Sequence, residues 1–175
     1  MPNFRITSSL SDLVDVNNVP FVQNQCQLGK LYSVVTGAQA VALGGFMVVQ
    51  LTNPANSAKT LYAQQLMISV TGVTTVDIIR NATFAASGAA LTPRNLNWAT
   101  SDASSINGKF LVQATDPTVS GIPLFSYVQT NAAPTLQNLL GSLIIPSGTA
   151  NRQLYFRMNC SALTTVSFSF NWVEL

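Results

Sequence analysis

GGFMVVQLTNPANSAKTLYAQQLMISVTGVTTVDIIRN, residues 44–81, is the stretch of the sequence that decides the fold. Phe46–Thr52 is a short apolar run rich in β-branched residues, and it ends at an Asn-Pro-Ala-Asn-Ser turn. Thr60–Val70 and Thr74–Ile79 are two further strand-like runs, separated by Thr-Gly-Val. The three runs predict consecutive strands paired as a β-meander, from which all-β sandwiches and barrels are built.

The C-terminal stretch Thr164–Leu175 has the clearest strand pattern in the chain. Its large apolar side chains alternate with polar ones, so one face is expected to be aromatic and buried. The members of this face are Val166, Phe168, Phe170 and Trp172. Further strands are expected at residues 30–35, 38–43, 108–115, 123–130, 142–145 and 153–159. Short strands with Gly, Pro and Asn turns between them predict an all-β, antiparallel, jelly-roll-like sandwich of about eight strands.

The first part of the chain differs in composition from the rest, and it predicts two segments. Residues 1–29 are interpreted as an extended N-terminal arm, and residues 30–175 as a single jelly-roll domain. The arm alternates weakly, while Pro20 and an Asn-Asn pair exclude a long regular strand. It either adds to the sheet of another subunit or forms a first edge strand of its own domain. Its expected anchors are Leu13, Val14, Val16, Val19, Phe21 and Val22.

The charge content separates this chain from most globular domains. Of the 175 residues, 47% are hydrophobic and only 8% are charged, against about 25% charged in ordinary domains. A surface of Asn, Gln, Ser and Thr repels copies of itself weakly, which favours dense self-association. A net charge of +2 with scattered basic residues predicts no nucleic-acid partner. No apolar run reaches the length of a membrane-spanning helix, so no membrane insertion is expected.

Catalytic and metal-binding patterns are absent from the sequence. The chain has no histidine, which excludes the Ser-His-Asp and Cys-His mechanisms and most zinc catalysis. The six carboxylates form no convincing acid–base pair, and Asp77 and Arg80 fall on opposite faces of a strand, where each is expected to pair with neighbours. We therefore expect no enzyme activity, cofactor or metal. Cys26 and Cys160 are either two inert thiols or a disulfide, formed within a subunit or between the arm of one subunit and the body of the next.

Four blocks of sequence carry a family resemblance: Val49–Pro54, Lys59–Tyr62, Ile79–Thr83 and Leu91–Asn97. They resemble small β-rich proteins of spore-forming Gram-positive bacteria, and the general plan resembles the subunits of bacterial endospore appendages. The resemblance implies a single jelly-roll domain whose N-terminal connector inserts into preceding subunits. It also implies export to the spore surface without a classical signal peptide. Paired connector cysteines occur in some of those subunits, whereas this arm has Cys26 alone.

These observations predict a structural subunit that assembles with itself into an extracellular fibre on the spore or cell surface. The residue 44–81 stretch is expected to offer a sheet edge to the arm, with Lys59 and Arg80 blocking strand addition nearby. A viral or phage jelly roll, as capsid, tail or receptor-binding protein, is the alternative. A carbohydrate-binding module is a further alternative, with its aromatic candidates Trp98, Trp172, Tyr62 and Tyr127. Trp98 is otherwise expected to cover one end of the core.

Overall fold

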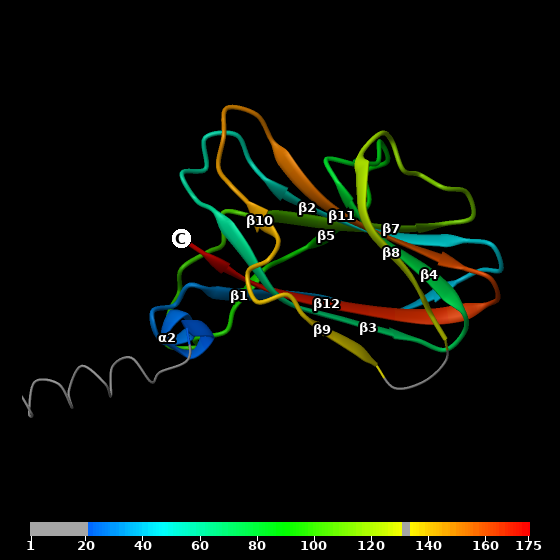
Figure 1. Ribbon diagram of the computed structural model, residues 1–175, viewed down its shortest axis with the longest axis horizontal. Helices are drawn as coiled ribbons and strands as arrows, with labels where there is room; N and C mark the ends of the chain where they lie inside the picture. Colours follow the sequence, from blue (N-terminus) through cyan, green and yellow to red (C-terminus); the bar gives the residue numbers. More distant parts are fainter. Residues whose placement is uncertain (1–20, 131–133) are drawn as a thin grey trace, which may run out of the picture.

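The computed structural model describes residues 21–130 and 134–175. They form one short helix and a series of β-strands (Figure 1). The elements of one sheet and the helix before it are α2 (Phe21–Gln27), β1 (Leu31–Val41), β3 (Leu61–Val70), β6 (Arg94–Asn95), β9 (Thr135–Asn138), β10 (Ile144–Ile145) and β12 (Thr164–Glu174). Those of the other sheet are β2 (Phe46–Asn53), β4 (Thr74–Arg80), β5 (Ala89–Leu91), β7 (Asn107–Gln113), β8 (Ile122–Gln129) and β11 (Arg152–Cys160).

The strands make two antiparallel six-stranded sheets that pack face to face (Figure 1). In the first sheet the order is β10-β3-β12-β1-β6, with β9 also paired to β3. In the second sheet the order is β5-β7-β2-β11-β4-β8. The first four strands alternate between the two sheets, and the orders β1-β12-β3-β10 and β2-β11-β4-β8 are those of a jelly roll. The all-β, jelly-roll-like sandwich expected from the sequence is confirmed.

The meander predicted for residues 44–81 is wrong, although its three strands are real. β2 pairs with β7 and β11, β3 pairs with β12, and β4 pairs with β8 and β11. The chain crosses to the opposite sheet between β2 and β3 and again between β3 and β4, so these strands are not hydrogen-bonded to each other. Local alternation and turn residues mark where strands begin and end, but they contain no information about the partner strand.

The positions of Lys59 and Arg80 contradict their expected role, which was to block strand addition at a free sheet edge. Arg80 is opposite Leu154 of β11 on one side and Ile122 of β8 on the other. β3, which follows Lys59, lies between β12 and the β9–β10 pair. Stretch 44–81 therefore contributes interior strands, and the free edges lie elsewhere.

The core between the sheets is built on the inward face of β12, as its alternation predicted. Val166, Phe168, Phe170 and Trp172 are fully buried. Phe156 of β11 packs between two of these rings, with centroid distances of 4.9 Å to Phe168 and 5.3 Å to Phe170. The core therefore joins the central strands of the two sheets through aromatic contacts, which contribute beyond the area they bury.

β1 is one strand where the sequence predicted two. The expected break falls inside it, because the register with β12 shifts between Val35 and Ala38. Gly37 has a φ of +67° there, a conformation that glycine adopts without steric strain. The predicted break is thus a β-bulge, which bends the strand without ending it.

The segment between β4 and β8 adds strands β5, β6 and β7 to the jelly roll and covers the outer face of the second sheet. Phe84 and Tyr155 are buried there in a second, smaller apolar cluster, with ring centroids 6.2 Å apart. Trp98 lies in this segment after β6, and its side chain is 96% exposed. The prediction that Trp98 covers one end of the core is therefore wrong. Tyr32, whose ring stacks on Trp172 in the core, is a buried aromatic at that end.

The described part of the arm is helical, which corrects the extended conformation predicted for residues 21–27. Phe21–Gln27 form α2, and Pro20 directly precedes it in the sequence, a position where proline favours helix initiation. Gln25 is buried, and its carbonyl accepts a hydrogen bond from the Lys30 backbone N–H. The helix therefore packs against the start of β1 and is continuous with the domain.

Candidate assembly surface

β8 is the last strand of its sheet and combines a free edge with exposed apolar side chains. Within the described residues it pairs with β4 on one side only. Its sequence, IPLFSYVQ, contains no charged residue. The exposed apolar side chains of β8 are Ile122, Leu124, Phe125 and Val128. Soluble proteins usually block such edges with charges, prolines or covering segments, and here Pro123 alone provides a block.

The neighbouring edge of the first sheet has the same character. β9 and β10 are short, and both pair with β3. Leu136, Leu140 and Ile144 are exposed along this side. Gln129 at the end of β8 donates a hydrogen bond to the Ile68 carbonyl of β3 at 2.8 Å, so the two edges lie on the same side of the sandwich. Together they form what we call the apolar edge surface, consisting of Ile122, Leu124, Phe125, Val128, Leu136, Leu140 and Ile144.

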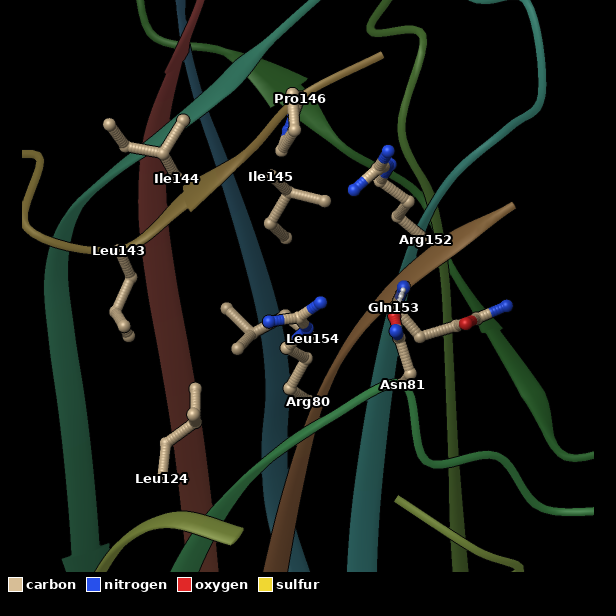
Figure 2. A pocket seen from close by; sticks show the side chains of 10 residues that line it. All are labelled: Arg80, Asn81, Leu124, Leu143, Ile144, Ile145, Pro146, Arg152, Gln153 and Leu154. Carbon is tan, nitrogen blue, oxygen red and sulfur yellow. Dashed lines mark hydrogen bonds between the residues drawn. The ribbon is translucent and has the colours of Figure 1, made fainter. Parts of the chain in front are cut away.

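A pocket of about 250 Å³ opens between the two sheets at one end of this surface (Figure 2). Leu124 of β8, Ile144 of β10 and Leu154 of β11 supply apolar walls, and the guanidinium groups of Arg80 and Arg152 lie at its polar side. Neither arginine forms an ion pair within the described ranges. The pocket thus combines an apolar interior with two cations whose charge is not neutralised by a neighbouring carboxylate.

The ion pairs of the described residues gather on the outer face of the second sheet, away from the edges. Arg157 donates from Nε to Asp77 Oδ2 at 3.0 Å and from a terminal nitrogen to Asp116 Oδ2 at 2.5 Å. Burial alone would raise the pKa of Asp116, but hydrogen bonds from Thr118 and the charge of Arg157 lower it. The expectation that Asp77 pairs with a neighbouring strand is thus confirmed, and this carboxylate serves structure.

Glu174 is a second carboxylate with a structural role. It is buried and accepts hydrogen bonds from Trp172 Nε1 at 2.9 Å and from the Ser105 backbone N–H at 3.0 Å. Ser104 also donates its hydroxyl to it. These hydrogen bonds hold the segment before β7 against the end of β12. They also supply the donors that a buried carboxylate needs. No group of three or more potential metal ligands occurs among the residues that the structure describes.

The expected arm anchors are only partly visible. Leu13, Val14, Val16 and Val19 lie outside the described residues. Phe21 and Val22 belong to α2, where Phe21 is exposed and Val22 lines a small pocket with Leu140. The described end of the arm therefore reaches the apolar edge surface at Leu140.

The disulfide interpretation of the two cysteines fails within one chain, because both thiols are free. Cys160 is buried at the end of β11, where burial raises its pKa and its sulfur contacts the Thr74 hydroxyl. Cys26 lies in α2, at the opposite end of β1. The alternative of two unreactive thiols describes Cys160 well, because a buried, protonated sulfur is a poor nucleophile.

Sequence reasoning predicted the strand at residues 123–130 but did not single out β8 as an edge. The signal that could have found it is its composition: the strand has an apolar side chain at almost every position and no charge. Such a run is equally typical of a fully buried interior strand. Only the sheet order distinguishes the two cases.

None of the described helices is long and apolar enough to cross a membrane. Comparisons of the chain with protein-family models, with curated proteins and with solved structures gave no match. The fold alone assigns no function to the chain, because one fold serves many functions.

Proposed function

We propose that the chain is a structural subunit that assembles with copies of itself into an extracellular fibre by adding strands at free sheet edges. The observation that carries the proposal is the apolar edge surface. β8 offers unpaired backbone groups beside exposed Phe125 and Val128, without a charge to repel a partner strand. Contiguous exposed apolar residues of this kind mark interaction sites on soluble proteins.

The donor in this proposal is the N-terminal arm of a neighbouring subunit. Main-chain hydrogen bonds to β8 would give affinity, and the aliphatic anchors would pack on the exposed side chains of the apolar edge surface. Each fully buried aliphatic side chain contributes about 1.5–3 kcal/mol, so several of them make dissociation very slow. The resemblance of the sequence to spore appendage subunits supports the spore surface as the site of such a fibre.

A lysine in the edge strand tests the proposal. Purified wild-type protein is expected to form filaments in negative-stain micrographs and large species in light scattering. Val128→Lys places a charge on the free edge and should leave mostly unassembled subunits, because a desolvated lysine opposes strand addition. Leu43→Lys, at another exposed apolar position, in the turn before β2, is the matched control and should assemble like the wild type.

Two results would contradict the proposal. Wild-type protein that stays monomeric at high concentration is not a self-assembling subunit. Unchanged assembly of Val128→Lys would mean that the β8 edge is not the acceptor.

A closed shell is the second candidate, favoured by the strand order itself. Jelly rolls with paired four-stranded halves build viral capsids as well as lectin and cupin domains. The same micrographs decide between the two, because a capsid subunit gives closed particles or small rings in place of filaments.

A further inference from the structure

The loop between β6 and β7 presents an exposed tryptophan on a hydrogen-bonded turn. Trp98 is 96% exposed, and its turn is closed by a 3.1 Å hydrogen bond from the Thr100 backbone N–H to the Asn97 carbonyl. The Asn97 side chain donates to the Gln27 carbonyl at 2.9 Å, and a Cβ added to Gly29 would lie only 2.6 Å from the Thr100 side chain. The turn therefore packs against the end of α2 and the residues that join it to β1, while the indole ring is accessible from outside.

The next part of the same loop lines a pocket of about 290 Å³. Asp102 and Ser105 line it from the loop, and Gly29 lines it from the segment against which the Trp98 turn packs. The ring and the pocket thus share both of their supporting segments, which makes them neighbours on the surface. None of the described residues that line this pocket belongs to the apolar edge surface, so strand addition at β8 does not involve it.

The charged groups of this pocket cancel one another. Lys30 and Lys59 supply two positive charges, and Asp102 and Glu174 supply two negative ones. None of the four forms an ion pair with another residue in the described part of the chain. A pocket without net charge favours neither an anionic nor a cationic ligand. It offers instead charged donors and charged acceptors side by side, and these make stronger hydrogen bonds than neutral groups do.

Two buried residues add fixed hydrogen-bonding groups to the pocket. Glu174 is buried, and its carboxylate is held by hydrogen bonds from Trp172 Nε1 and the Ser105 backbone N–H. Burial raises the pKa of the Tyr32 hydroxyl, and the nearby carboxylates of Glu174 and Asp102 raise it as well. The Tyr32 hydroxyl therefore stays protonated at neutral pH, and it can both donate and accept a hydrogen bond.

We infer that this pocket and the Trp98 ring together bind a neutral carbohydrate. The apolar C–H face of a pyranose ring packs on the indole, which is a large apolar surface with one polar edge. Sugar hydroxyl groups both donate and accept, so they bond to the lysine donors and to the carboxylate acceptors of a pocket that has no net charge. An apolar ligand or a simple ion uses only some of these groups. The inference goes beyond the proposed function, because it gives the fibre a ligand to which it adheres.

A glycan array identifies the sugar, and fluorescence then tests the ring. The array contains neutral oligosaccharides of glucose, galactose, mannose and N-acetylglucosamine, together with sialylated and sulfated glycans. The full chain should bind a set of the neutral probes, and added sialic acid or sulfate should not strengthen binding. Of the two tryptophans, Trp172 is fully buried and Trp98 is exposed. Titration with the bound oligosaccharide should therefore shift the Trp98 emission to shorter wavelength, because a covered indole loses its contact with water.

Two variants remove the two parts of the site separately. Trp98→Ala should raise the Kd for the bound oligosaccharide at least about tenfold, because truncating a hot-spot tryptophan has effects of this order. Lys59→Ala should raise it about threefold or more, since an exposed charged donor contributes less than a buried one. Both side chains are exposed, so both variants should melt like the wild type. Leu163→Ala and Arg94→Ala, at exposed positions outside the site, are the matched controls and should bind like the wild type.

An array on which no neutral oligosaccharide binds would overturn the inference. Equal affinities of Trp98→Ala and the wild type would also overturn it, because the ring would then take no part in binding. Binding confined to sialylated or sulfated glycans would assign the pocket to an anion instead. Each of these results leaves the proposed function standing, since both variants should form filaments like the wild type. Wild-type protein that binds the sugar but stays monomeric would remove the proposed function alone.

Discussion

Arg157 shows how this chain uses a small number of charges. The guanidinium bridges Asp77 of β4 and Asp116 of the loop before β8. Burial would lower the pKa of Arg157, but the two carboxylates raise it. Tyr155, two residues earlier on the same face, makes a 3.2 Å contact with the Thr118 hydroxyl. These contacts attach the 114–121 loop, and with it the entry to β8, to the centre of the second sheet.

The pH dependence of stability tests this network. Because the folded-state pKa of Asp116 is lowered, its contribution is present above the ordinary carboxyl pKa of about 3.9 and is lost as the pH falls through the lowered value. Asp116→Asn should therefore show a smaller fall in melting temperature between pH 6 and pH 2 than the wild type.

At pH 6 the loss for Asp116→Asn should be at most about 1 kcal/mol, because the pair is partly exposed. Asp102→Asn, which removes an exposed carboxylate without an ion pair among the described residues, is the matched control. Identical pH profiles for Asp116→Asn and the wild type would show that the bridge to Arg157 contributes nothing to stability.

At the scale of the elements, the sequence located strands better than it paired them. The bounds of β2, β3, β4, β11 and β12 agree with the predicted runs to within a residue or two. Their partners could not be predicted, because local patterns do not say which distant strand pairs with which. β2 and β4, for example, both pair with β11, which lies about a hundred residues or less further along the chain. The exposure of Trp98 and the helix at Phe21–Gln27 were missed for a related reason, since both depend on packing that local patterns do not encode.

Two phenylalanines of the second sheet, Phe156 on β11 and Phe125 on the edge strand β8, distinguish the core from the edge. Phe156 is fully buried between Phe168 and Phe170, so Phe156→Ala should lower the free energy of unfolding by about 3–5 kcal/mol. Phe125 on β8 is 54% exposed, and Phe125→Ala should stay within about 1 kcal/mol of the wild type. Urea denaturation measures both, under conditions where the protein is unassembled.

Equal losses for the two variants would mean that β8 is packed as tightly as the centre of the sandwich. That result would contradict its assignment as a free edge.

At the scale of the whole molecule, the distribution of charge and apolar surface favours association. With 8% charged residues, the chain has little electrostatic repulsion between copies. Arg157 and its two carboxylates are neutralised on the outer face of one sheet, while β8 has no charge. The edge strands β8, β9 and β10 and the pocket lie together on one side of the sandwich, and Trp98 follows β6 at the other side of the first sheet. A molecule with two such unlike surfaces can be joined to a neighbour at each.

At the scale of the whole molecule, deleting the arm tests whether the chain can lose assembly and still fold. A variant lacking residues 2–20 should retain α2, both sheets and the core, because the residues that form them lie outside the deleted segment. It should melt as cooperatively as the wild type and form no filaments in negative-stain micrographs, since the acceptor edge at β8 would have no donor strand. Adding a synthetic peptide of residues 2–20 should raise its melting temperature as the peptide fills the edge. Filaments of normal appearance without the arm would contradict its role as the donor strand, and a failure to fold would show that the arm belongs to its own domain.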